Sequence, residues 1–428
     1  MAVDQGSAEL SEHFFRHEFG RMVAHLAARF GTGRIELIED AVQSALLAAV
    51  SGWGARGVPE NPSGWLRKVA CNRLIDQLRK LDREACPVAD EEGPTPMEAP
   101  SEGAFDSEIA DAQLRMLFVC CDPTLAARAQ LVLSLKLLCG FSTREIAARL
   151  FISEDNVQKT LSRGRNRLRA LFSAPDVSWN DPSPSMLLER LPLVLSVIYL
   201  LFNEGYSSQR EDEVIRRELC DEALRLGQLV AQHAVGDVAE SWALLAIMHF
   251  HRARLDARTD ADGHLLLLRE QDRSRWDREE LHRGFVALAQ AQQGQRFSRY
   301  LGEAAILAEH CLAPSYEKTR WSEIVDLYEL LERHCGPSPL YTLNRAIALA
   351  EWQGPESALR VLQAVTPPAW LARYYLWDAT MGELLRRSGR HDDARRYLQR
   401  AIDAAPTHGE RRIFSRHLAR CQAADASP

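Results

Sequence analysis

Apolar residues recur every three to four positions along most of the chain, which is the spacing of one face of an α-helix. The clearest such stretches are Ile35 to Val50, Pro62 to Arg83 and Glu154 to Leu171. Alternating Val, Ile and Thr residues bounded by turns, which would predict strands, do not occur. The pattern therefore predicts an all-α protein, with a loop at the Gly- and Pro-containing residues 51–61.

Two stretches of Pro and polar residues interrupt the helical pattern and divide the chain into three parts. Residues 85–112 contain eight Asp or Glu and no Lys or Arg. Such a segment buries too little apolar surface to fold alone, so we expect a flexible acidic linker at residues 85–108. Its ends would lie about 30 Å apart as a coil and up to about 90 Å apart when stretched. With a second linker at 173–184, the predicted domains are 1–84, 109–172 and 185–428.

Charge is distributed unevenly, although the formal net charge of the 428 residues is −7. Residues 64–84 contain six Lys or Arg against three acids, and residues 142–172 contain seven against three. Two basic modules flank an acidic segment, which favours nucleic acid as a partner of both modules.

Other chemistry is absent from the sequence. No phosphate-binding Gly loop, nucleophile elbow or set of metal ligands at a known spacing is present, so we expect no enzyme, no cofactor and no metal site. The nine cysteines include no CxxC pair, which favours reduced thiols and a cytoplasmic location. The longest apolar run, residues 193–202, is too short for a membrane span, so we expect no membrane partner.

A helix-turn-helix is predicted in the second basic module. Ser142 and Glu145 form a capping box at the start of a short helix, after Gly140 has stopped the preceding one. Ser153 is an N-cap for a longer basic helix whose inner side carries Val157 and Leu161. A solvated amphipathic helix would show the same basic face, but the combination of capped helix, turn and basic helix favours DNA binding.

The first module combines a basic helix with aromatic residues. Arg67, Lys68 and Asn72 lie along the stretch from Pro62 to Arg83, close to Trp53 and Trp65. Aromatic and basic groups together suit unstacked single-stranded bases, although tryptophans at such positions are also common in a core. A second polar face, Glu39 to Gln43, indicates either a protein-binding surface or solvent exposure.

These features together resemble a bacterial RNA polymerase sigma factor of the extracytoplasmic-function (ECF) type. Residues 38–47 resemble the family's polymerase-binding helix, residues 61–76 its segment that reads the −10 element, and residues 141–165 its helix-turn-helix that reads the −35 element. The resemblance implies a protein that confers promoter specificity on RNA polymerase, with core polymerase (β′ clamp helices and β flap) and promoter DNA as partners. The acidic segment is similar to the family's linker, which follows the basic RNA exit channel.

The resemblance also implies roles for particular residues. The −35 duplex would be bound by Gln158, Lys159, Ser162, Arg163, Arg165 and Arg167. The displaced −10 strand would be held by the 52–61 loop together with Arg67, Lys68, Asn72 and Asp76. The β′ clamp helices would be contacted by Asp40 and Gln43. Ser44 departs from the family, which usually has an acid at that position.

The last part of the chain resembles a tetratricopeptide (TPR) array. Small residues and Leu recur at its spacing from Gly382 to Pro406, and a weaker copy covers residues 344–365. Residues 200–206 and 270–277 resemble recurring segments of the ECF subgroup with a TPR-like extension. Each segment also has a purely structural interpretation, in which Gly205 ends a helix and Asp277 caps the start of the next helix. The resemblance implies a regulatory domain that contacts the sigma modules, polymerase or another protein.

Two alternatives remain open on the sequence. The chain could be a stand-alone helix-turn-helix DNA-binding regulator with a ligand-sensing TPR half, or a TPR scaffold with a vestigial N-terminal part. A stand-alone regulator would bind duplex operators without polymerase, whereas a sigma factor needs polymerase because its two modest basic patches neutralise few phosphates.

Overall fold

A computed structural model describes residues 4–85, 105–150, 152–172, 184–207, 215–294, 296–365 and 374–425. These residues form α-helices and short 3-10 helices, with an isolated β-bridge between Thr259 and Leu265 and no β-strand among them. The all-α prediction is confirmed. The predicted linkers at 85–108 and 173–184 lie largely outside the described residues. Residues 105–108 are an exception, because they already belong to a helix that starts at Phe105.

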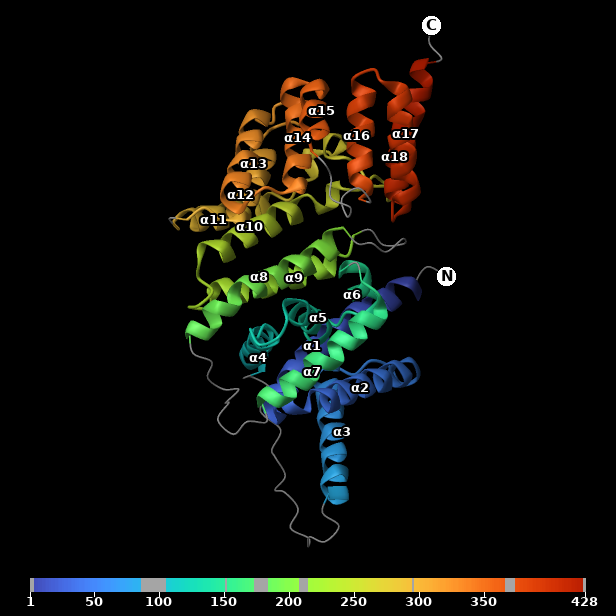
Figure 1. Ribbon diagram of the computed structural model, residues 1–428. Helices are drawn as coiled ribbons and strands as arrows, with labels where there is room; N and C mark the ends of the chain where they lie inside the picture. Colours follow the sequence, from blue (N-terminus) through green and yellow to red (C-terminus); the bar gives the residue numbers. More distant parts are fainter. Residues whose placement is uncertain are drawn as a thin grey trace. The chain divides into compact units, whose positions relative to one another are not determined.

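The chain divides into two compact units, residues 1–201 and 202–428. The α-helices of the first unit, labelled in Figure 1, are α1 (Asp4–Phe30), α2 (Ile35–Arg56), α3 (Pro62–Ala85), α4 (Phe105–Cys120), α5 (Ala127–Leu137), α6 (Thr143–Leu150), α7 (Glu154–Phe172) and the first part of α8 (Pro184–Tyr206). A short 3-10 helix, η1 (Thr32–Arg34), lies between α1 and α2 in the chain.

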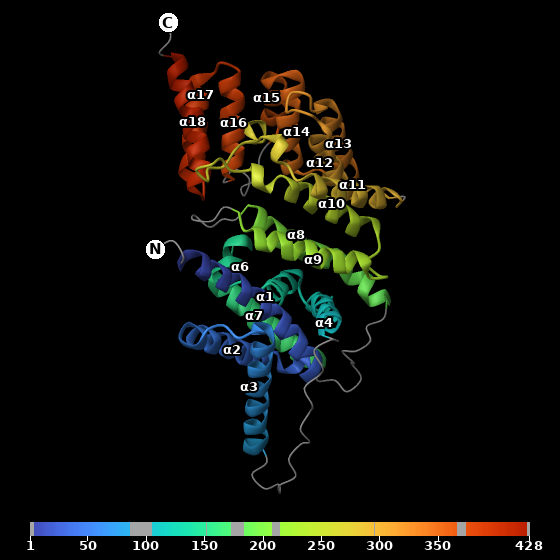
Figure 2. The same cartoon turned by 180° about the vertical axis from the view of Figure 1, so that it is seen from behind.

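The helices of the second unit, seen from behind in Figure 2, follow α8 in chain order. They are α9 (Arg217–Gln232), α10 (Ala239–Ala253), η2 (Leu255–Ala257), η3 (Leu268–Glu270), η4 (Arg273–Arg275), α11 (Arg278–Gln292), α12 (Arg299–Leu312), α13 (Trp321–Cys335), α14 (Pro339–Gln353), α15 (Pro355–Gln363), α16 (Tyr375–Arg387), α17 (His391–Ala404) and α18 (His408–Asp425).

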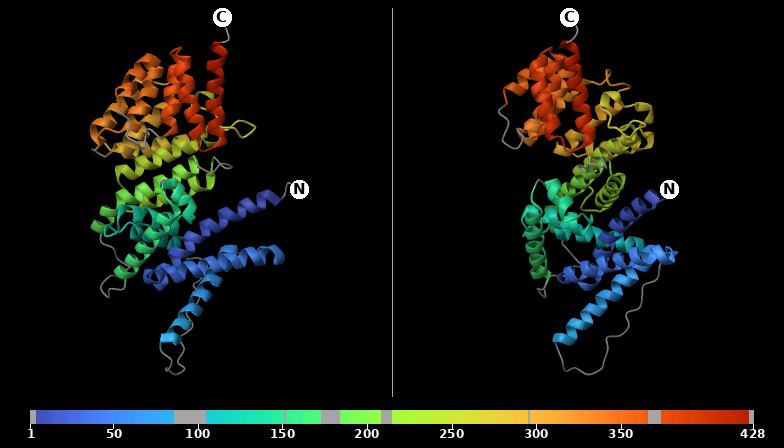
Figure 3. Two further views of the ribbon diagram at one scale, coloured as in Figure 1. Left: turned by 45° about the vertical axis from the view of Figure 1, so that its right-hand side comes forward. Right: turned by 90° about the vertical axis from the view of Figure 1, so that its right-hand side faces the viewer.

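The helices of the first unit are held by side chains at the predicted helical spacing. Ile38, Val42 and Ala45 of α2 are completely buried, as are Leu66 and Leu74 of α3. The far end of α3 extends away from the other helices of this unit (Figure 3).

One part of the first unit differs from the sequence prediction. Residues 51–56 were predicted to be a loop, but α2 continues through Arg56. The ring of Trp53 stacks on that of Phe15, with centroids 5.7 Å apart, and this packing outweighs the weak helix preference of the glycines. The helix ends at Gly57, whose φ of 82° is readily adopted only by glycine. The loop that follows is therefore shorter than predicted.

The two basic modules pack against each other inside the first unit. The helix α1 contacts α4 and α5, and η1 and α2 contact α7. A Cβ on Gly20 of α1 would lie 2.0 Å from the carbonyl oxygen of Leu138, so this close approach requires glycine. Arg190 of α8 pairs with the buried Asp122 and donates to the carbonyl of Phe118 at 3.0 Å. The first part of α8 therefore belongs to the same packed unit.

The second unit contains helix pairs at the predicted TPR-like spacing. The α17 residues Ala394, Leu398 and Ala401 are fully buried, and a Cβ on Gly382 of α16 would lie 2.7 Å from Leu398. Asp277 caps α11 by accepting from the N–H groups of Glu279 and Glu280. The predicted cap is thereby confirmed.

Gly205 does not terminate its helix directly, because α8 runs to Tyr206. A Cβ on Gly205 would lie 2.6 Å from the backbone nitrogen of Cys220 in α9. The glycine therefore permits close helix packing.

Candidate nucleic-acid interface

The helix-turn-helix is formed by α6 and α7, and both of its predicted caps are present. The Glu145 N–H donates to the Ser142 hydroxyl at 3.2 Å, and the Ser142 N–H donates to the Glu145 carboxylate at 2.7 Å. Ser153 accepts from the N–H of Asn156 at 3.3 Å, which starts α7. Because Val157 and Leu161 are buried, the opposite side of α7 faces outward.

Most of the predicted −35 residues lie on this outward side. Gln158, Lys159, Ser162, Arg163 and Arg167 are exposed. Lys159 pairs with Asp155 on the same helix at 2.7 Å, whereas Arg163 and Arg167 have no ion-pair partner within the described residues. The exposed side chains supply guanidinium, ammonium, amide and hydroxyl donors, which are the groups that bind base edges and phosphates.

Arg165 is placed differently from the other predicted −35 residues. Its guanidinium makes two 2.8 Å hydrogen bonds to the carboxylate of Glu39 on α2. Arg169 of α7 likewise pairs with Glu36 of α2. Burial raises the pKa of Glu39, and Arg165 opposes that increase. In this structure Arg165 is therefore engaged within the protein.

A third ion pair between the two modules lies at the capping box. Arg16 of α1 contacts the Glu145 carboxylate at 3.0 Å, and both side chains are largely buried. Burial alone would raise the pKa of Glu145, but Arg16 and the hydrogen bonds to Ser142 outweigh it and lower the pKa from 4.5 to about 2. The charged form of Glu145 is therefore strongly favoured.

We expect Glu145 to make the stability of the first unit depend on pH. Because its folded-state pKa is depressed, ionised Glu145 stabilises the fold above about pH 4.5, and this contribution is lost as the pH falls toward 2. Glu145→Gln should therefore cost roughly 2 to 3 kcal/mol at pH 7 and much less near pH 3. Urea titrations of the full chain at both pH values measure the difference. The control variant Glu154→Gln, at an exposed acid of α7, should change the stability little at either pH. An equal loss of stability for Glu145→Gln at both pH values would contradict the lowered pKa of Glu145.

The predicted −10 residues are only partly brought together on α3. Lys68, Asn72 and Asp76 are exposed and lie four residues apart along one side of the helix. Arg67 is half-buried and its Nε donates to the Ser63 carbonyl at 3.4 Å, so it lies away from this line. Asn61 precedes the helix and caps its start, because the Asn61 side chain accepts from the Gly64 N–H at 2.8 Å.

The tryptophans beside this helix form an aromatic cluster. Trp53 contacts the rings of Phe14, Phe15 and Trp65 at centroid distances of 5.6 to 6.1 Å. The alternative that these tryptophans pack internally therefore has direct support, since Trp53 fixes α2 against α1 and α3.

An exposed face of α2 extends beyond the predicted polymerase contacts. Asp40 and Gln43 are exposed, and the same side continues into Leu47 and Val50, which are 67% and 60% exposed. Ser44 is half-buried beside them. The sequence analysis missed Leu47 and Val50 because apolar residues at helical spacing usually indicate a core. Such exposed apolar side chains on one helix face are typical of a protein-binding surface.

One cluster of possible metal ligands also escaped the sequence analysis. Single ligand atoms of Asp260, Asp262 and His264 lie within 4.8 Å of one another in a surface turn. Asp260 accepts from the N–H groups of Asp262 and His264 at 3.0 and 2.8 Å, so its carboxylate already stabilises the turn. These bonds account for the cluster without a metal.

Comparisons with known proteins agree with this arrangement. The family model of sigma-70 region 2 matches residues 15–84, and that of sigma-70 region 4 matches residues 116–168. A family of unknown function, DUF6596, matches residues 190–292. A protein of Rhizobium meliloti (strain 1021), described as uncharacterized, is 35% identical over 379 residues that cover 88% of each chain. No solved structure matches the chain significantly.

Region 2 and region 4 in this order define a DNA-binding transcription initiation factor. The chain belongs to the ECF-type sigma factors of the sigma-70 family, with a helical C-terminal extension. It confers promoter recognition on RNA polymerase and promotes transcription initiation, so core polymerase and promoter DNA are its partners. Within the described residues, no helix is long and apolar enough to cross a membrane.

Proposed function

We propose that this sigma factor reads the −35 element with the exposed side of α7 and the −10 strand with the exposed line of α3. The observation that best supports the proposal is the outward side of α7, which carries five exposed polar side chains. This helix is the second of a helix-turn-helix in which both helices are capped at their N-termini. In the same proposal, the α2 face from Asp40 to Val50 binds the β′ clamp helices, and region 4 contacts the β flap.

Engagement of both promoter elements requires the two modules to separate. The −10 and −35 elements are about 25 base pairs apart, which is about 85 Å along B-DNA. Two modules held together by the Arg165–Glu39, Arg169–Glu36 and Arg16–Glu145 pairs cannot cover that distance. The 19 residues between the end of α3 at Ala85 and the start of α4 at Phe105 can stretch to about 65 Å, and the lengths of the modules themselves supply the remainder. We therefore propose that all three ion pairs break at the promoter, which frees Arg165 and Arg169 for phosphate contacts.

Run-off transcription with purified core polymerase, with and without this protein, tests the proposal. Transcripts from a cognate promoter that appear only in its presence are the expected result. Tight binding to duplex operators without initiation would instead support the stand-alone regulator.

We expect Arg163→Ala to weaken transcription from promoters that depend on the −35 element. Loss of a base contact by an exposed arginine costs roughly 1 to 3 kcal/mol, or about five- to 150-fold in promoter affinity. Abortive initiation on promoters with intact and scrambled −35 elements measures the effect. The Arg163→Ala variant should bind core polymerase as tightly as the unchanged protein. The control variant Arg396→Ala, at an exposed arginine of α17, should keep its transcription activity. Loss of core binding by Arg163→Ala would contradict the placement.

The C-terminal extension is proposed to regulate the sigma modules. Truncation after residue 175 should alter transcription, but it also removes α8 and leaves the buried Asp122 without Arg190. A second truncation after residue 207 keeps α8, so comparing the two separates loss of packing from loss of regulation. Unaltered run-off transcription by the longer fragment would reject a regulatory role.

A further inference from the structure

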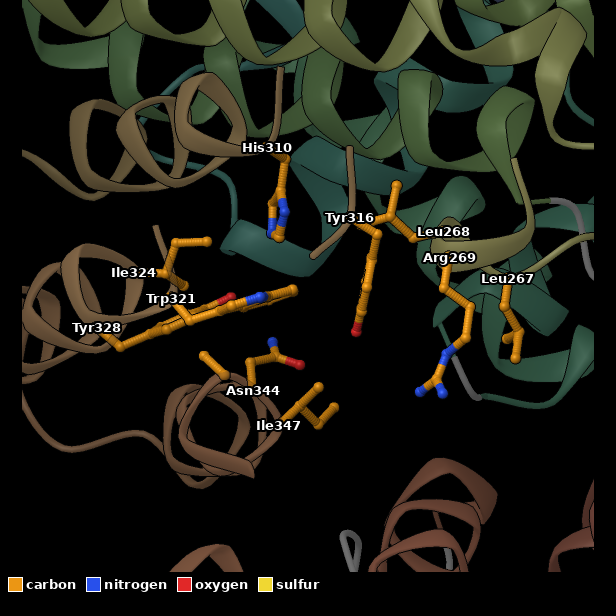
Figure 4. A pocket seen from close by; sticks show the side chains of 11 residues that line it. Leu267, Leu268, Arg269, His310, Tyr316, Trp321, Ile324, Tyr328, Asn344 and Ile347 are labelled. Atoms are coloured by element: carbon orange, nitrogen blue, oxygen red, sulfur yellow. The ribbon is translucent and has the colours of Figure 1, made fainter. Parts of the chain in front are cut away.

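A cavity of about 300 Å³ lies within the second unit, between η3, α13 and α14 (Figure 4). Three aromatic residues, Tyr316, Trp321 and Tyr328, line it together with aliphatic side chains such as Ile324 and Ile347. The volume is at the lower end of the range for small-molecule sites, which suits a ligand of one or two rings.

The aromatic wall is held in place by contacts behind it. Trp321 makes edge contacts with Tyr316 and His310 at centroid distances of 4.9 and 5.3 Å. The Arg273 guanidinium donates to the carbonyls of His310 and Ala313 at 2.6 Å, which fixes the segment that leads to Tyr316. The cavity is therefore formed before any ligand enters, which lowers the entropic cost of binding.

Two polar side chains provide hydrogen-bond donors at the cavity. Figure 4 shows the Asn344 amide and the Arg269 guanidinium facing the open space beside the Tyr316 ring. Arg269 contacts the Glu351 carboxylate at 3.7 Å, while Arg387 holds the same carboxylate at 2.5 Å. Because two guanidinium groups share one carboxylate, part of the Arg269 charge remains available to a ligand.

The charges around the cavity favour an anion. No Asp or Glu is among the residues that line it. Burial, followed by the positive charges of Arg254 and Arg273, lowers the pKa of His310 to about 3, so its imidazole is neutral at physiological pH. A cationic ligand could stack on the aromatic wall but would be repelled by the same arginines.

We propose that this cavity binds a small aromatic carboxylate, with its ring against Trp321 and Tyr316 and its carboxylate bound by Arg269 and Asn344. A single shared guanidinium and one amide match a singly charged carboxylate. A phosphate dianion would need more charged donors than the cavity offers. The inference concerns binding alone and holds whichever way the C-terminal unit acts on transcription.

Isothermal titration calorimetry of the full chain with three probes tests the proposal without polymerase or DNA. Indole-3-acetate, indole-3-acetamide and tryptamine share one ring system and carry side-chain charges of about −1, 0 and +1 at neutral pH. We expect indole-3-acetate to bind at least tenfold more tightly than the amide, and tryptamine to bind most weakly. No binding by any probe, or equal binding by all three, would overturn the proposal.

Two variants locate the binding, and a third serves as the control. Arg269→Gln should remove the preference for the acid over the amide, whereas Arg396→Gln, on the exposed surface of α17, should keep it. Ile347→Trp, at a 39% exposed position beside the cavity, should block all three probes by filling the space. Acid-selective binding that survives both Arg269→Gln and Ile347→Trp would place the site elsewhere and reject the assignment. Circular dichroism confirms that each variant remains folded.

Discussion

Leu47→Glu should reduce the affinity of this sigma factor for core RNA polymerase by roughly 30- to 1000-fold. Leu47 is 67% exposed on the α2 face that also carries Asp40, Gln43 and Val50. Burying one Leu or Val side chain contributes about 1.5 to 3 kcal/mol, and burying an unpaired carboxylate in its place adds a further penalty. The combined loss of about 2 to 4 kcal/mol gives the stated range.

Fluorescence anisotropy of the labelled protein, titrated with core polymerase, measures this loss. Leu47 is mostly in solvent, so the variant should fold normally and keep its helix content. Val286→Glu is a matched control, because Val286 is 47% exposed on α11 in the other unit. Unchanged core affinity for Leu47→Glu would remove this face of α2 from the polymerase interface.

The features that the sequence predicted correctly depend on residues that are close together in the chain. The caps at Ser142 and Ser153 need only bonds that span three residues, so they can be recognised without any knowledge of the fold. The burial of Val157 and Leu161 likewise follows from helical spacing alone.

The features that the sequence did not predict depend on partners that are distant in the chain. Arg165 and Glu39 are 126 residues apart, and nothing local to either residue indicates that they pair. The exposure of Leu47 depends on which side of α2 the other helices cover, and the helical form of residues 51–56 depends on the packing of Trp53 against α1. Long-range packing therefore decided which predicted contact residues are available at the surface.

Arg165→Ala should destabilise the first unit by about 3 kcal/mol or more near pH 8. The Glu39 side chain is 4% exposed, and Arg165 is its hydrogen-bonded partner, with a smaller contribution from the positive charge of Lys136. Removing one partner of a buried ion pair leaves an unpaired charge in the interior, which commonly costs 3 to 5 kcal/mol. Urea titration of the full chain, followed by circular dichroism, measures the loss, and Arg167→Ala on the exposed side of the same helix serves as the control.

The pH dependence of this loss identifies its cause. Burial is the largest influence on Glu39 and raises its pKa, and without Arg165 the pKa should rise further. As the pH falls through this raised value, the carboxyl binds a proton and the unpaired charge disappears. The destabilisation by Arg165→Ala should therefore be greatest near pH 8, shrink toward pH 5, and be largely removed at pH 8 by adding Glu39→Gln. A loss that is the same at both pH values and persists with Glu39→Gln would mean that Arg165 acts through packing of its aliphatic stem, and that its ion pair with Glu39 does not hold α7 against α2.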